Sequence, residues 1–237
     1  MKDSSQIIKD ELAACGSPRK AKDLSRFFKT GKGDYGEGDR FLGVTVPHSR
    51  AIAQKYITAD ETALHALLES SYHEHRLVAL LILTYRFERT KDETERACIV
   101  RFYQQHVEAI NNWDLVDLSC YKILGGWLHD KNKQLLYDWA RTPHLWKQRI
   151  AMVSCMYFVK RGDFTDCLAI ADLLISHSHD LIHKAVGWLL REVGKKDEQR
   201  LIDYLTPRYR QMPRTMLRYA IERFTPELRQ AFLKGNI

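Results

Sequence analysis

The sequence predicts an all-α protein built as an α-solenoid, a stack of helix pairs curved around a concave basic surface. Apolar residues recur with a helical period, and no stretch shows the strict alternation of a half-buried strand. The 237 residues include only 12 glycines and 6 prolines, which argues against a loop-rich or all-β design. Similar helix pairs recur about every 35 residues, which is typical of helical-repeat proteins.

The composition is that of an ordinary soluble globular protein, with 45% hydrophobic and 28% charged residues. The net charge of +7 suits a polyanionic partner, although a basic protein without such a partner can have the same balance. No segment is apolar enough over sufficient length to cross a bilayer, and the N-terminus lacks the apolar core of a secretory signal. We therefore expect a cytoplasmic protein.

Neither the cysteines nor the histidines suggest a metal site. The five cysteines are scattered, and none forms a C-x-x-C pair, so they indicate reduced thiols. Histidines cluster at residues 73–75 and 176–180, but neither group has a second cluster at ligand spacing. We expect no metal and no cofactor.

Residues 1–45 form a helical N-terminal part ahead of the repeats. A short amphipathic helix around residues 7–13 is stopped by Gly-Ser-Pro at 16–18, and a basic helix follows over residues 19–29. The loop at 30–43 is rich in glycine, so its backbone can turn sharply. It lacks the G-x-x-x-x-G-K-[ST] order of a nucleotide-binding loop, and we expect it to face DNA or to link helices.

From about residue 46 to residue 237 the sequence predicts helix after helix with short connections, within a single domain spanning 1–237. Pro47 suits the first turn of a helix, and helical spacing of apolar residues is strongest around residues 77–84 and 150–157. The predicted helices are 47–57, 60–69, 74–89, 92–109, 113–128, 131–141, 144–161, 164–176, 180–195, 197–210, 212–223 and 226–234.

One helix of each pair carries a basic residue followed by an apolar run. Arg76, Arg149 and Lys184 each begin such a run, with Arg149 and Lys184 about 35 positions apart and Arg76 about twice that distance before Arg149. In a solenoid these side chains recur in phase and form a stripe that can follow the phosphates of duplex DNA. The alternative is that their charged ends reach solvent from core helices.

Residues 111–117, Asn-Asn-Trp-Asp-Leu-Val-Asp, predict the start of a helix. Asn112 can cap it, and Asp114 lies in the first turn, where a carboxylate is favoured. Trp113 and Asp117 are four residues apart and share one face. An aromatic plane beside an acid can hold a cation or a developing positive charge. The alternative is an ordinary helix start with a buried tryptophan and a solvated aspartate.

Three motifs follow one another along the chain: W-D-x-V-D at residue 113, W-x-Q-R at 146 and G-W-x-x-R-E at 187. In this order, within a basic helical chain, they resemble the bacterial alkylpurine DNA glycosylases of the AlkD family, which are built from HEAT-like repeats. The resemblance covers roughly residues 20–210. It implies a monomer in the bacterial cytosol or nucleoid that acts on alkylated double-stranded DNA.

The resemblance also implies roles for individual residues. Asp117 matches the family's catalytic carboxylate, and Trp113 and Trp188 match two indoles that pack against the deoxyribose and backbone of the lesion. Arg149 matches the arginine that holds the nearby phosphate. Two positions depart from the family pattern: a tyrosine of the family is replaced by Phe27, and a glutamine by Thr45. The glycine-rich insertion 31–39 is also longer than in the best-known member of the family. The expected DNA-binding residues are Phe27, Thr45, Arg76, Lys184, Arg191 and Lys195.

The implied reaction is hydrolysis of the N-glycosidic bond of a purine alkylated at N3 or N7. Such a base is cationic and leaves as a neutral molecule, so a carboxylate that stabilises the oxocarbenium-like sugar and positions water is sufficient. No lysine suggests lyase chemistry, so a monofunctional glycosylase is expected, with the base left stacked or exposed. The alternatives are a non-catalytic DNA-binding relative and a protein–protein scaffold. The choice among 3-methyladenine, 7-methylguanine and bulkier adducts stays open.

Overall fold

The computed structural model describes residues 3–237, and its regular secondary structure is helical throughout that range. The only β-type pairing among these residues is an isolated bridge between Arg40 and Tyr72. The prediction of an all-α helical-repeat fold is confirmed. The chain divides into two compact units, unit 1 ending at Ser119 and unit 2 comprising Cys120–Ile237. Nowhere between residues 3 and 237 is a helix both long and apolar enough to cross a membrane.

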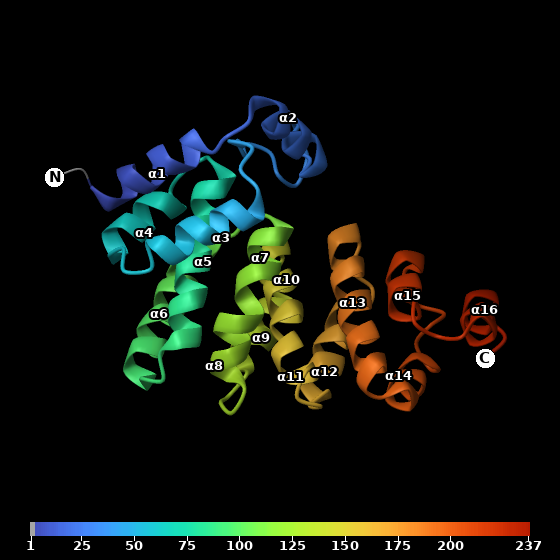
Figure 1. Ribbon diagram of the computed structural model, residues 1–237. Coiled ribbons are helices and arrows are strands. Elements are labelled where there is room, and N and C mark those ends of the chain that lie inside the picture. Colours follow the sequence, from blue (N-terminus) through green and yellow to red (C-terminus); the bar gives the residue numbers. More distant parts are fainter. Residues whose placement is uncertain (1–2) are drawn as a thin grey trace. The chain divides into compact units, whose positions relative to one another are not determined.

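Unit 1 is organised around the long helix α5, which packs against α1, α3, α4 and α6 (Figure 1). Its residues from His73 to Thr84 are all buried, so α5 forms the core of the unit. The helices of unit 1 are α1 (Ser4–Ala14), α2 (Pro18–Phe27), α3 (Val46–Lys55), α4 (Glu61–Leu68), α5 (His73–Arg89), α6 (Glu93–Gln105), the 3₁₀ turn η1 (Val107–Ala109) and α7 (Trp113–Cys120), whose last residue opens unit 2.

Local sequence signals account for where these helices begin. The side chains of Ser17, Asp60 and Asp92 accept hydrogen bonds from backbone N–H groups in the first turns of α2, α4 and α6. Pro47 lies in the first turn of α3, as predicted. Because caps and breakers act locally, the predicted and observed starts agree within a few residues.

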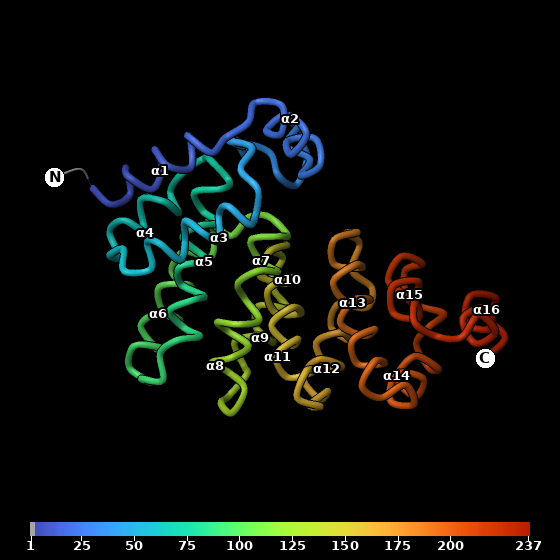
Figure 2. The backbone as a smooth tube through the Cα atoms, in the orientation of Figure 1, coloured from blue at the N-terminus to red at the C-terminus, as the bar shows by residue number. Residues whose placement is uncertain are grey.

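The segment between α2 and α3 is irregular, as predicted, and the chain trace in Figure 2 shows it as a loop between the two helices. Two glycines are needed for its path. Gly43 has a φ of 83°, and a Cβ atom there would lie 2.2 Å from the carbonyl oxygen of Ser17. A Cβ on Gly36 would lie 2.6 Å from the carbonyl oxygen of Phe28. The segment therefore lies directly against α2 and the residue that follows it.

Unit 2 is a stack of helix pairs. The π-helical turn η2, α10, α13 and α15 pack one against the next, while α9 and α12 pack behind α10 and α13. The elements are η2 (Tyr121–Gly125), α8 (Gly126–Leu128), α9 (Gln134–Arg141), α10 (Leu145–Ser154), α11 (Met156–Val159), α12 (Thr165–Leu174), α13 (Asp180–Lys196), α14 (Glu198–Leu205), α15 (Arg214–Ala220) and α16 (Pro226–Lys234).

Glycines allow the helices of this stack to approach closely. An added Cβ on Gly125 would lie 2.4 Å from the carbonyl oxygen of Ser154 in α10, and one on Gly187 would lie 2.5 Å from that of Met216 in α15. Backbone thus packs directly on backbone at these two positions. Any larger residue would force the neighbouring helices apart.

Some predicted helices are interrupted. The predicted helix 113–128 contains the π turn, the predicted helix 144–161 is divided at Cys155, and the predicted helix 92–109 ends at Gln105 before η1. No proline lies at these interruptions, so the apolar spacing runs through them without a visible signal. Periodicity predicts that a segment is helical but not that one turn is wider or tighter.

Candidate active site in unit 1

Helix α7 places Trp113 and Asp117 one turn apart, and both side chains are half-buried. They line a cavity of about 540 Å³ formed by α2, the irregular segment, α3, α5 and α7. The predicted residues Phe27 and Thr45 line the same cavity. The structure therefore brings together four of the predicted site residues. Further walls come from Leu24, Phe28, Phe41, Val44, Leu77 and Leu118.

Aromatic rings hold the indole of Trp113 in place. The ring of Phe28 stacks on it, with centroids 5.1 Å apart and planes at 24°, and the ring of Phe27 meets it edge-on at 5.8 Å. Phe28 in turn stacks on Phe41 at 5.2 Å. Phe27 is 63% exposed, whereas Phe28 and Phe41 are buried. An indole supported in this way presents a fixed aromatic surface beside the carboxylate of Asp117.

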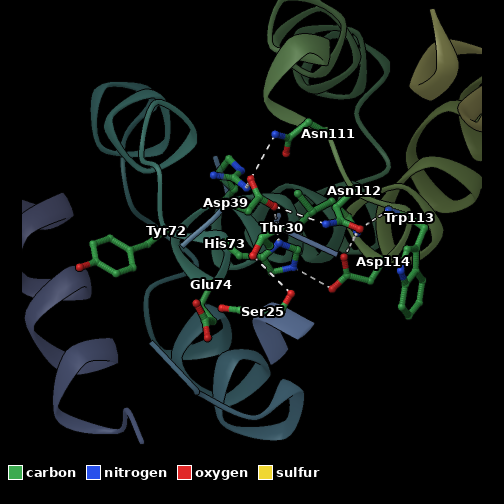
Figure 3. Close-up of polar contacts among 12 residues, drawn as sticks. Ser25, Thr30, Asp39, Tyr72, His73, Glu74, Asn111, Asn112, Trp113 and Asp114 are labelled. Atoms are coloured by element: carbon green, nitrogen blue, oxygen red, sulfur yellow. Dashed lines mark hydrogen bonds and ion pairs between the residues drawn. The ribbon is translucent and has the colours of Figure 1, made fainter. Parts of the chain in front are cut away.

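A buried polar cluster lies where α5 and α7 begin (Figure 3). Asp39, from the irregular segment, accepts hydrogen bonds from His73 Nδ1 at 3.3 Å and Arg76 Nη2 at 2.6 Å. His73 Nε2 donates to Asp114 at 2.9 Å. The amides of Asn111 and Asn112 donate to the two carboxylate oxygens of Asp39 at 3.2 and 3.4 Å. Asp39 therefore joins the irregular segment to the start of α5 and to the two residues before α7.

The charges in this cluster depend on one another. Burial by itself lowers the pKa of His73, but the charge of Asp114 and the hydrogen bonds to Asp114 and Asp39 raise this pKa from 6.5 to about 9. Burial likewise opposes ionisation of Asp39, but His73 and Arg76 outweigh it, so the pKa of Asp39 is lowered. At neutral pH the cluster holds an imidazolium between two carboxylates.

Glu74 fixes the end of the irregular segment. Its Oε1 accepts from the backbone N–H groups of Gly43 at 2.8 Å and Val44 at 3.2 Å, and its Oε2 accepts from that of Leu42 at 2.9 Å. Glu74 is only 2% exposed. Backbone donors that satisfy a buried carboxylate hold residues 42–44 against the start of α5.

The structure places the predicted DNA-binding residue Arg76 inside unit 1. This side chain is buried at 4% exposure, pairs with Asp39 and donates to the carbonyl oxygen of Ser70 at 2.6 Å. To contact DNA, this guanidinium would have to leave a buried ion pair. The role of Arg76 toward DNA stays a prediction.

The other predicted residues lie in unit 2. Arg149 in α10 is 5% exposed, and its Nη1 donates to the carbonyl oxygen of Leu181 at 2.6 Å. The remaining four are on α13, where Lys184 pairs with Asp180 at 2.7 Å and Lys195 with Glu192 at 2.7 Å. Arg191 pairs with Glu222, and Trp188 is half-buried. The roles of these residues toward DNA stay predictions.

Sequence reasoning missed the contributions of Asp39, His73 and Glu74. It treated Asp114 only as a first-turn acid and examined His73 and Glu74 only as metal ligands. Among the described residues, no group of three or more metal-binding side chains is assembled. The available signal was the run His73-Glu74-His75-Arg76 at the start of an apolar helix, because four consecutive polar residues there need partners if they are buried. The partners themselves are distant in sequence.

The comparisons with known proteins agree with this fold. Residues 8–224 match the model of the protein family described as DNA alkylation repair enzyme. A solved structure named "Predicted DNA alkylation repair enzyme from Enterococcus faecalis" is similar, with a TM-score of 0.70 and 17% identity over 89% of this chain and 97% of that chain. No curated protein matches. Because the family model spans most of the sequence, the chain belongs to the DNA alkylation repair enzyme family.

Proposed function

We propose that the protein is a monofunctional DNA glycosylase of the AlkD type. It hydrolyses the N-glycosidic bond of purines alkylated at N3 or N7 in duplex DNA and leaves an abasic site. The observation that carries this proposal is that Asp117 and Trp113, one turn apart on α7, line the same cavity in unit 1. Family membership supports a role in alkylation repair, and a repair enzyme acts on DNA.

The proposed chemistry requires little from the protein because the lesion is already activated. The cationic base leaves as a neutral purine, and positive charge develops on the sugar. The carboxylate of Asp117 stabilises that charge and positions the attacking water, while the indole face of Trp113 contributes about 0.5–2 kcal/mol by a cation–π interaction. The apolar cavity walls lower the local dielectric and strengthen both interactions.

The residues of unit 2 are proposed to bind the DNA backbone. Lys184 and Lys195 are partly exposed, and each pairs with an acid of its own helix. Such surface pairs are weak, so a phosphate can replace the acid. Arg149 and Trp188 are proposed to hold the phosphate and the sugar by their resemblance to the family's residues. The net charge of +7 favours this association.

The test is a base-release assay with purified protein and duplex DNA methylated at N7 of guanine and N3 of adenine. Asp117→Asn keeps the shape of the side chain and removes its charge. We expect this variant to bind DNA as well as the wild type and to release base about 10²–10⁴-fold more slowly. Asp138→Asn, which removes one exposed carboxylate on α9, is the matched control and should retain full activity.

The outcomes separate the alternatives. Undiminished release by Asp117→Asn would refute the role of this carboxylate. DNA binding without any release by the wild type would indicate a non-catalytic DNA-binding relative. Absence of both would favour a protein–protein scaffold. For Arg149→Ala we expect weaker binding and a log–log salt slope reduced by about one, as for the loss of one phosphate contact.

A further inference from the structure

Two bonds at the start of α7 link the buried cluster directly to the backbone around Trp113. Asn112, which donates to Asp39, accepts a hydrogen bond from the backbone N–H of Trp113 at 2.8 Å through its Oδ1. Asp114, which accepts from His73, also accepts from the backbone N–H of Leu115 at 2.8 Å. The residues on both sides of Trp113 are therefore held by side chains outside α7.

His73 is central to this arrangement because it spans both carboxylates. Its two nitrogens face Asp39 from the irregular segment and Asp114 from α7, and Arg76 on its own helix pairs with Asp39. Two cations thus balance two carboxylates in a region almost closed to water, since His73 and Asp39 are each 2% exposed in their side chains. Without the imidazolium, Asp39 would keep Arg76, but Asp114 would lose the cation that pairs with it.

Aromatic packing connects the same histidine to the cavity. The ring of Phe28 lies 5.0 Å from that of His73 and 5.1 Å from that of Trp113, between centroids. The ring of Phe41 stacks on His73 at 4.7 Å and 23°. The imidazole of His73 is therefore fixed by contacts on its faces and hydrogen bonds on its edges. Its displacement would move the ring that supports the indole of Trp113.

We propose that His73 is a positioning residue: by bridging Asp39 and Asp114 it fixes the first turn of α7, and with it the orientation of Trp113 and Asp117. The inference rests on the proposed glycosylase function, because it assigns what keeps that site in working geometry. It also gives the glycine-rich insertion a role. The insertion delivers Asp39 to the cluster and thereby supports the site from behind.

The fit of the insertion agrees with this role. Gly36 lies against the residue before α7 and the residue after α2, since a Cβ atom on it would be 3.3 Å from Asn112 Nδ2 and 2.6 Å from the carbonyl oxygen of Phe28. Its backbone N–H donates to the carbonyl oxygen of Lys29 at 3.1 Å. From Gly36 the chain reaches Asp39 within one turn, where the N–H of Asp39 donates back to the carbonyl oxygen of Gly36 at 3.1 Å.

The experiment compares His73→Gln with His75→Gln in the full-length chain. His75 is the next histidine on α5, two residues after His73, and it bonds Ser70 rather than α7. Three quantities are measured: the single-turnover rate of base release, the dissociation constant for methylated duplex DNA, and the NMR position of the Trp113 indole N–H. We expect His73→Gln to slow release by up to about 10²-fold with nearly unchanged DNA affinity, because a small misplacement of catalytic groups is sufficient for such a loss.

The same variant should shift the Trp113 resonance, whereas His75→Gln should leave both the release rate and that resonance at their wild-type values. Wild-type rates for release and an unmoved Trp113 resonance in His73→Gln would overturn the proposal. If the wild type releases no base, the glycosylase function fails, and the Trp113 resonance alone decides whether His73 positions α7.

A second variant keeps the test decisive if His73→Gln does not fold. Asp114→Asn preserves the side-chain shape and removes the charge that faces His73. It should also slow release without a matching loss of DNA affinity. Wild-type release by Asp114→Asn would contradict the proposal. If both single variants fold, the losses in the double variant should be less than additive, because both remove the same bridge. Full additivity there would also contradict the proposal.

Discussion

The pH dependence of stability should reveal the buried imidazolium of His73. The pKa of His73 is raised from 6.5 to about 9 by Asp114 and Asp39. Because the folded-state pKa lies above the unfolded one, the stabilisation is fully present below pH 6.5. It is lost as the pH rises through about 9. Folding stability should therefore fall on the alkaline side.

The size of this stabilisation follows from the difference between the folded-state and unfolded-state pKa values of His73. A difference of about 2.5, at about 1.4 kcal/mol for each tenfold change, corresponds to about 3 kcal/mol of unfolding free energy. His73 is 2% exposed, so solvent screening does not reduce this figure appreciably. Between pH 6.5 and 9 the contribution should decline by about 1.4 kcal/mol per pH unit.

The measurement is urea unfolding at a series of pH values from 5 to 10 for the wild type and His73→Gln. The difference between their unfolding free energies should shrink by about 3 kcal/mol across the alkaline range. A difference that stays constant from pH 6.5 to 10 would refute the assigned ionisation, whatever the absolute stabilities.

His75 supplies a control of opposite sign on the same helix. Burial lowers the pKa of His75 to about 4, with smaller contributions from the charges of Lys9 and Arg76. Its folded-state pKa therefore lies below the unfolded one, so its neutral form stabilises the protein above pH 6.5. That contribution is lost as the pH falls toward 4. The difference between wild type and His75→Gln should accordingly change on the acidic side and not on the alkaline side.

Three further predictions concern the packing around the site and in unit 2. Glu74→Gln weakens bonds to three backbone N–H groups and should lower the unfolding free energy by about 2 kcal/mol, measured by urea unfolding at pH 7. Gly43→Ala should destabilise the protein by more than about 3 kcal/mol. Gly33→Ala, at a residue with a similar φ but open space around it, should cost only about 1 kcal/mol. Equal losses in the two variants would contradict the close approach of Gly43 to Ser17. Gly187→Ala should lower the melting temperature by several degrees because its Cβ would meet the carbonyl oxygen of Met216; an unchanged melting curve would mean that α13 and α15 do not touch there.

Base-release chemistry and stability are separable in these variants. Asp117→Asn keeps the shape of the side chain and removes the charge proposed to stabilise the transition state, so base release should fall by a much larger factor than stability. Glu74→Gln changes a buried structural interaction, so it should lower the unfolding free energy more than it lowers the rate of base release. A comparison of the two therefore distinguishes loss of chemistry from loss of fold.

The sequence alone determined the helical architecture and most helix starts. Helical spacing of apolar residues, polar caps such as Asp60 and Asp92, and prolines in first turns act within a few residues of one another, so they can be read without knowledge of distant partners. The spacing of Trp113 and Asp117 likewise predicted one shared face, because four residues make about one turn. The family motifs lie on the predicted helices.

Only the tertiary structure decided how charged residues are used. The sequence predicted Arg76 as part of a basic surface stripe. In the structure this side chain is buried, and Asp39 from a different segment is its ion-pair partner. The same segment converts His73 from a candidate metal ligand into an imidazolium between two carboxylates. The charge and exposure of a side chain depend on groups that folding brings together. Contacts between residues dozens of positions apart produce no periodic pattern in the sequence from which they could be predicted.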